Sequence, residues 1–136
     1  MKALLCSLLL TGCAPVIAES LYLGAWSSHF NKGDYNEQHN LVAYEHKDWT
    51  IGYFKNSYNR DTVFIAHDFK YKFRNIEVGA MAGVMRGYRV CYGDDESNAD
   101  VCPMVAPYLE ITDAPVRPRF LLFGLDAAAV AVRIEW

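Results

Sequence analysis

The residues best suited to chemistry in this sequence are a histidine and a serine, each at the end of a short run of alternating polarity. His29 closes the run Leu21–Phe30, and Ser57 follows directly on the run Trp49–Asn56. An imidazole beside a hydroxyl is the smallest unit for acyl transfer, because the imidazole takes the proton that makes the serine oxygen nucleophilic. If these runs are the first and third strands of one small barrel, His29 and Ser57 should meet at its rim.

A second feature is an inner surface suited to an apolar chain. In the run Ile76–Val90, alternate residues form a face of glycines and methionines above one acid: Glu77, Gly79, Met81, Gly83, Met85 and Gly87. Glycine in a strand leaves space beside it, and a small barrel either fills its centre with side chains or holds one ligand. Two interpretations stay open: an apolar pocket in one half of the barrel, or a packed core that uses glycine for curvature.

Two prolines mark a weak point in the expected wall. Pro103 and Pro107 stand four residues apart in the run Val101–Ile111, on the same face. Proline has no N–H to donate to a strand ladder, so a central strand should avoid it. The pair predicts an open seam through which lipid passes; the alternative is a simple bulge.

Eight alternating runs separated by turn residues fill the sequence after residue 18, and no stretch has a sustained helical period. They are Leu21–Phe30, Asn40–His46, Trp49–Asn56, Thr62–Phe73, Ile76–Val90, Val101–Ile111, Arg119–Leu125 and Ala128–Trp136. Each has one continuous apolar face and one face that is polar toward a single end, as a lipid-facing wall requires. The sequence therefore predicts an all-β fold, an eight-stranded antiparallel up-and-down transmembrane β-barrel.

A soluble sandwich or lipocalin-like barrel, with its apolar faces inward, is the opposing interpretation. Aromatic residues near the ends of the runs favour the membrane, because they resemble interfacial girdles. They are Tyr22, Trp26, Phe30, Trp49, Tyr71, Phe73 and the terminal Trp136. His67 argues against it, because alternation places this polar ring mid-strand on the lipid face.

The N-terminus has the form of an export signal. Met1-Lys2 precedes the apolar run Ala3–Leu10, which is too short to span a bilayer, and Ala18 suits cleavage. We therefore expect residues 1–18 to be a signal peptide and residues 19–136 to be the barrel in a Gram-negative outer membrane. Residues 10–13 offer a competing cleavage site, because they resemble a lipobox; cleavage there would leave a lipidated Cys13 as the N-terminus. The connections at 31–39, 57–61, 91–100 and 125–127 should face outward.

Charge and cysteines limit the partners. The chain has 13 Lys and Arg against 16 Asp and Glu, a formal net charge of −3, which is not the balance of a nucleic-acid-binding protein. In an exported chain, Cys91 and Cys102 should form a disulfide across an acidic turn. No His or Cys pair nearby has ligand spacing, so no metal or cofactor is predicted. We expect a monomer.

The order of these features resembles the PagP-type lipid A palmitoyltransferases, a family of eight-stranded outer-membrane barrels. His29 stands where the family has its essential histidine, and Tyr35-Asn36-Glu37 is similar to its YNE. Residues 54–59, FKNSYN, are similar to its FKDSWN, which holds an essential aspartate and serine. Shorter matches follow in order at Ala82-Gly83-Val84 and at Pro103 and Pro107.

The resemblance implies an acyltransferase that moves a palmitoyl-like chain from a phospholipid to lipid A. His29 and Ser57 would carry the chemistry, with Asn56 in the place of the family's aspartate. By the same resemblance, the substrate would be bound by Tyr35, Glu37, Gly79, Pro103 and Pro107, with Gly79 near the depth of the acyl pocket.

Asn56 is the main departure from the family, since an amide orients a neighbour but cannot act as a base. If the amide has weakened the mechanism, Asn56→Asp should raise activity; if it only orients a neighbour, the change should be neutral or harmful. The alternative function is a non-catalytic small outer-membrane barrel of the adhesion or membrane-stabilising type. An enzyme needs an apolar cavity, whereas a structural barrel fills its centre with interlocking charges.

Overall fold

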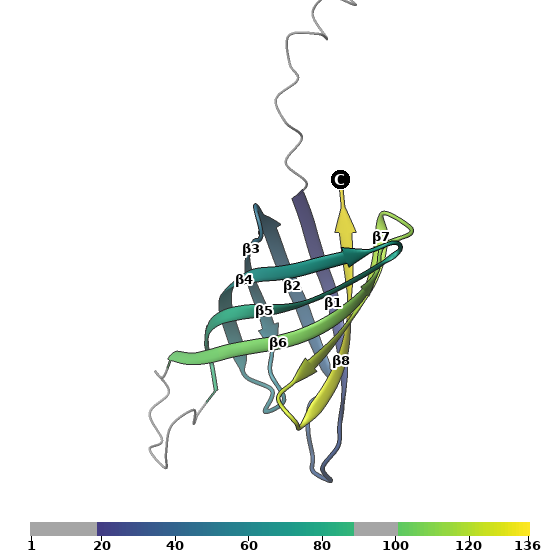
Figure 1. Cartoon of the computed structure of the whole chain (residues 1–136). Helices are drawn as coiled ribbons and strands as arrows, with labels where there is room; N and C mark the ends of the chain where they lie inside the picture. Colours follow the sequence, from purple (N-terminus) through teal and green to yellow (C-terminus); the bar gives the residue numbers. More distant parts are fainter. Residues whose placement is uncertain (1–18, 89–100) are drawn as a thin grey trace, which may run out of the picture.

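The computed structural model describes residues 19–88 and 101–136, which form eight antiparallel strands joined in sequence order into a closed barrel (Figure 1). The strands are β1 (Glu19–His29), β2 (Gln38–His46), β3 (Trp49–Lys55), β4 (Asp61–Phe73), β5 (Ile76–Arg86), β6 (Val101–Ile111), β7 (Val116–Phe123) and β8 (Ala127–Glu135). The predicted fold class is confirmed. Within the described ranges, no helix is long and apolar enough to cross a membrane.

The two ends of the barrel differ. Glu19 and Trp136 lie at one end, here called the terminal end, with the connections β2–β3, β4–β5 and β6–β7 (Figure 1). The opposite end, here called the loop end, carries the connections β1–β2, β3–β4 and β7–β8. His29 and Ser57 both lie at the loop end, on β1 and just after β3.

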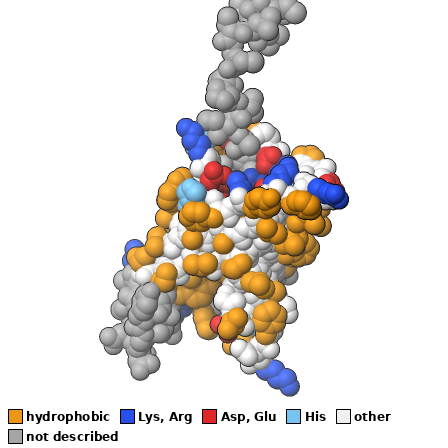
Figure 2. Space-filling model, viewed as in Figure 1, with side chains coloured by type: hydrophobic (Ala, Val, Ile, Leu, Met, Phe, Trp, Pro, Cys, Tyr) orange, Lys and Arg blue, Asp and Glu red, His pale blue; other side chains and the backbone are white. Residues whose placement is uncertain are grey.

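Side chains alternate between the outside and the inside of the wall, as the sequence predicted. In β6, every second residue from Cys102 to Glu110 is buried, and those between are exposed. The outer surface is apolar, with charged side chains gathered toward the terminal end (Figure 2). This apolar-out, polar-in arrangement is that of a transmembrane barrel.

Six of the seven predicted girdle aromatics do lie on the outer surface, and Tyr22 does not. Tyr22 is only 2% exposed and donates a hydrogen bond to Glu45 inside the barrel. His67 lies on the outer face, as alternation predicted, and is flanked by Trp49 and Phe69 with ring centroids 5.0 and 4.7 Å away. Its polar ring is therefore covered by aromatic neighbours.

Most strand boundaries agree with the prediction within two residues, but β5 ends at Arg86 and not at Val90, and β7 begins at Val116 and not at Arg119. The additional strand residues at the start of β7 include Pro118, which pairs with Val132 of β8. The ladder between β7 and β6 reaches only as far as Arg119. Pro118 thus occupies an edge-like position, which proline tolerates.

A bulge in β1 decides which of its residues face the interior. Tyr22 points inward, so strict alternation would send His29 outward. Gly24 and Ala25 both have positive φ angles, +80° and +84°, and the register to β2 and β8 shifts there. Because the bulge inserts one residue, Ser27 and His29 turn inward.

The interior is divided into a charged half and an apolar half. Toward the terminal end, the guanidinium of Arg119 contacts Glu110, Asp68 and Glu77 at 2.6, 3.1 and 3.4 Å. Arg133 adds bonds of 3.0 Å to Glu110 and 3.1 Å to Glu45. Here these residues are called the charged plug: Glu45, Asp68, Glu77, Glu110, Arg119 and Arg133.

Candidate functional site

The structure brings the two predicted chemical residues together at the loop end. The Nε2 atom of His29 lies 2.8 Å from the Oγ atom of Ser57, across the barrel mouth from β1 to the β3–β4 loop. The ring of His29 stacks on Tyr35, with centroids 4.2 Å apart and planes 18° apart. Its Nδ1 atom is buried with no hydrogen-bond partner. The imidazole is therefore oriented by stacking and by Ser57.

Ser57 is held by both neighbouring loops. Its carbonyl oxygen accepts a 2.9 Å hydrogen bond from the backbone N–H of Asn36. The Tyr88 side chain also hydrogen-bonds with Ser57, and burial raises the pKa of the Tyr88 phenol. Tyr88 therefore stays protonated at neutral pH and can donate a hydrogen bond beside Ser57.

Asn56 is buried, and its amide organises the β3–β4 loop. The side-chain nitrogen donates to Thr62 Oγ1 at 3.1 Å and to the Gly87 carbonyl at 3.0 Å. The side-chain oxygen accepts from the backbone N–H groups of Tyr58 and Arg60 at 2.9 and 3.1 Å. All four positions of the amide are occupied in this way, so Asn56 positions Ser57 through the backbone.

Tyr35 and Glu37, the two predicted substrate-binding residues of the β1–β2 loop, have different surroundings. Tyr35 is partly buried against His29 and also meets Tyr58, with ring centroids 6.2 Å apart. The Glu37 side chain is exposed, while its backbone oxygen accepts a 2.9 Å bond from Ser27. Tyr35 thus belongs to the His29 site, and the Glu37 carboxylate faces the surroundings of the rim.

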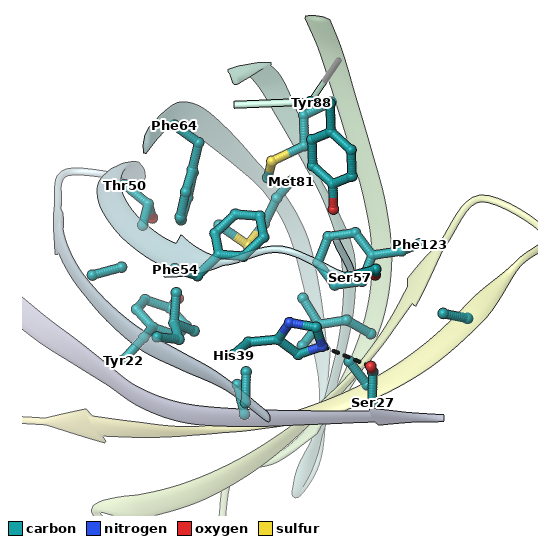
Figure 3. A pocket seen from close by; sticks show the side chains of 18 residues that line it. Tyr22, Ser27, His39, Thr50, Phe54, Ser57, Phe64, Met81, Tyr88 and Phe123 are labelled. Atoms are coloured by element: carbon teal, nitrogen blue, oxygen red, sulfur yellow. Dashed lines mark hydrogen bonds between the residues drawn. The ribbon is translucent and has the colours of Figure 1, made fainter. Parts of the chain in front are cut away.

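Below the rim lies a narrow apolar cavity of about 70 Å³. Figure 3 shows aromatic and methionine side chains around it, with Tyr88, Phe123 and Ser57 together on one side. The lining includes Tyr22, Leu41, Ala43, Thr50, Phe54, Phe64, Met81, Met104, Leu121, Phe123, Ala129 and Ala131. The half of the interior toward the loop end is therefore an apolar pocket, as the first of the two interpretations of the glycine-rich face expected.

Glycines in the wall do not themselves provide this space. A Cβ atom at Gly52 would meet Phe64 at 2.5 Å, and one at Gly79 would meet the Tyr108 hydroxyl at 2.7 Å. Aromatic side chains from neighbouring strands fill the room that these glycines leave. Gly79 is not among the described cavity-lining residues. It lies closer to the terminal end than Met81, against the charged plug.

A second space of about 430 Å³ connects the mouth with the outer surface between β6 and β7. Its lining combines His29 and Ser57 with the outward-facing Pro103 and the inward-facing Phe123. β6 pairs with β5 along its whole length, but its ladder to β7 covers only Tyr108 to Glu110. The predicted weak seam is therefore present, on the β7 side of β6. Pro107 lines a shallow outer groove beside the same seam.

Ser27 and His39 also line the cavity, and the sequence analysis missed them. Their side chains lie 2.6 Å apart. Alternation with Leu41 and Ala43 would have turned His39 inward, but Ser27 faces inward only because of the bulge in β1.

Cys102 is buried on the inner face of β6. Cys91 lies outside the described residues, so the Cys91–Cys102 disulfide stays a prediction. Within the described ranges, no group of three or more His, Cys, Asp or Glu side chains is placed to hold a metal ion.

Comparison with known proteins supports the fold. No family model and no curated protein matches this chain. Among solved structures, a de novo designed transmembrane β-barrel superimposes with a TM-score of 0.63 over 88% of this chain and 95% of the designed chain. The two sequences are 10% identical, so the likeness concerns the architecture alone: the chain folds as an eight-stranded barrel of the transmembrane type.

Proposed function

We propose that this protein is an outer-membrane acyltransferase that moves a fatty acyl chain from a phospholipid to lipid A. The observation that carries the proposal is the 2.8 Å contact between His29 and Ser57 at the mouth of an apolar cavity. The apolar outer surface supports placement in a membrane, where both lipids are present. The resemblance to PagP-type enzymes at residues 35–37 and 54–59 supplies the specific substrates.

In the proposed reaction, the ester carbonyl of a phospholipid lies beside Ser57, with its chain in the space of about 430 Å³ at the mouth and its end in the cavity below. The Ser57 oxygen attacks the carbonyl carbon while His29 Nε2 takes the hydroxyl proton. That proton passes to the departing lysophospholipid oxygen, which leaves an acyl ester on Ser57. A lipid A hydroxyl then attacks this ester, His29 takes its proton, and the proton returns to the Ser57 oxygen. Asn56 acts by holding the loop, and Tyr35 by stacking on His29.

The seam between β6 and β7 is the proposed route for lipid. It places Pro103 next to the same space as His29 and Ser57. A lipid in the surrounding bilayer would reach the cavity mouth from the side, without leaving the membrane.

The charged plug supports the alternative, a barrel that stabilises the membrane or presents its loops. Interlocking charges fill the terminal half, as expected of a structural barrel. The apolar cavity in the other half favours the enzyme, because a purely structural barrel has no need of it.

Mass spectrometry of lipid A from cells that express the full chain tests the proposal. The wild type should add the mass of one acyl chain, and His29→Ala and Ser57→Ala should each remove that added mass while the barrel still folds. Ser28→Ala is the matched control, because Ser28 lies next to His29 but faces outward. A folded wild type that adds no acyl mass would favour the structural barrel.

A further inference from the structure

A second serine and histidine form a hydrogen-bonded chain inside the apolar cavity. Ser27 Oγ lies 2.6 Å from His39 Nε2, and His39 Nδ1 lies 2.6 Å from the carbonyl oxygen of Lys55 (Figure 3 shows the first of these contacts). The three groups come from β1, β2 and β3, so the arrangement exists only in the closed barrel.

The hydrogen bonds fix the direction in which protons are shared. A carbonyl oxygen only accepts, so His39 Nδ1 carries the proton and donates it to Lys55. The imidazole is 7% exposed among apolar side chains, where an uncompensated positive charge is costly. In the neutral ring Nε2 is then an acceptor, and it receives the hydroxyl proton of Ser27.

This is the arrangement that activates a serine: a base within hydrogen-bond reach of the hydroxyl, itself oriented by a third group. The His29 and Ser57 pair has no such third group, since His29 Nδ1 is without a partner. The backbone around Ser27 is also fixed, because its N–H donates to the Glu37 carbonyl at 2.9 Å just beyond the bulge.

We propose that Ser27 and His39 form a second acyl-accepting dyad, which attacks carboxylic esters whose acyl chain enters the cavity from the mouth. The inference rests on the proposed function only in that the cavity takes an acyl chain. The Tyr88 hydroxyl lines the same cavity and is a donor for the ester carbonyl oxygen.

The step balances without a further reagent. The Ser27 oxygen bonds to the ester carbonyl carbon, His39 Nε2 takes the hydroxyl proton, and the departing alcohol oxygen receives that proton as its bond breaks. Water then attacks acyl-Ser27, which releases a fatty acid and restores the hydroxyl. The dyad therefore adds a slow ester-hydrolase activity to the barrel.

Reaction of the folded, full-length protein in detergent with a long-chain alkyl fluorophosphonate tests this inference. We expect peptide mapping of the wild type to find an adduct on Ser27, besides one on the Ser57 nucleophile of the proposed function, so the assignment needs no variant. Ser27→Ala should abolish the Ser27 adduct and leave the one on Ser57, and the outward-facing Ser28→Ala should retain both. His39→Gln should slow labelling of Ser27 by about 100-fold or more, the effect of losing a general base.

Several outcomes would overturn the inference. One is an adduct confined to Ser57 or to another residue; another is labelling of Ser27 at an unchanged rate in His39→Gln. The heat-modifiable gel mobility of each variant shows whether it has folded. Lipid A acylation that persists while Ser27 stays unlabelled would refute this inference alone, and labelling of Ser27 without lipid A acylation would refute the proposed function alone.

Discussion

The two halves of the barrel interior are built from the same strands yet differ in charge and in the space they leave free. The terminal half holds the charged plug, in which two arginines are enclosed by four carboxylates and two tyrosine rings. The loop half holds an apolar cavity, and the described residues that line it carry hydroxyls and the His39 imidazole as their polar side-chain groups. Arg119 lies 3.7 Å from the Tyr108 ring centroid, and Tyr22 stands at the boundary between the halves.

This difference shows how one small barrel separates stability from chemistry. Buried charges that are all paired hold the strands in one register, but they leave no room for a ligand. An apolar space has room for a ligand but contributes little packing. Placing the plug at one end allows the other end to stay open without loss of the fold.

Removing the centre of the plug should have the largest effect. Arg119→Ala leaves the buried carboxylates of Asp68 and Glu77 without their arginine and removes one of the two arginines that hold Glu110. Breaking a buried ion pair from one side costs about 3–5 kcal/mol. Urea titration followed by heat-modifiable gel mobility measures the loss. Lys55→Met, in the exposed pair with Asp61, is the control and should unfold near the wild type. An equal loss in both variants would show that the plug has no special role.

Asn56→Asp places a carboxylate in the loop half, away from Arg119 and Arg133 of the charged plug. The new group loses the donors to Thr62 and Gly87 and sets its charge against the Gly87 carbonyl. Each buried group left unsatisfied costs about 1–3 kcal/mol, so we expect a less stable loop and lower lipid A acylation. Limited proteolysis of the loop and acylation mass measure the two effects. Higher acylation in Asn56→Asp would contradict the positioning role and favour a weakened ancestral mechanism.

Filling the cavity should alter function more than stability. Ala129→Leu adds a side chain inside the loop half, whereas Ala128→Leu adds the same side chain on the outer face. Overpacking costs about 1–3 kcal/mol, and the space removed should shorten the acyl chain that the protein transfers. The distribution of chain lengths on lipid A measures this change. Identical distributions in both variants would place the acyl chain elsewhere.

Closing the seam should have the smallest effect. Replacing Pro103 and Pro107 with alanine restores two N–H donors along β6, beside the stretch where β7 pairing is absent. A tighter seam should slow acylation several-fold with no change in the folded fraction. The time course of lipid A modification measures the rate. An unchanged rate would show that lipid reaches the cavity by another route.

The sequence alone determined the strand number, the sense of alternation and the division into a charged and an apolar half. These follow from period-2 patterning, which residues such as Val130 and Arg133 carry locally. Sequence order also predicted that His29 and Ser57 would meet, since strands next but one to each other are close in a small barrel.

The tertiary structure decided which polar groups meet and what they do. The bulge at Gly24 and Ala25 turns Ser27 and His29 inward, and a one-residue shift of register has no signature in the alternation itself. The role of Asn56 depends on Gly87, which closure of the barrel brings beside it from 31 residues away. The site of the seam follows from where the β6–β7 ladder ends. Each of these is a cross-strand relation, fixed by hydrogen-bond register between segments distant in sequence, so no single segment could encode it.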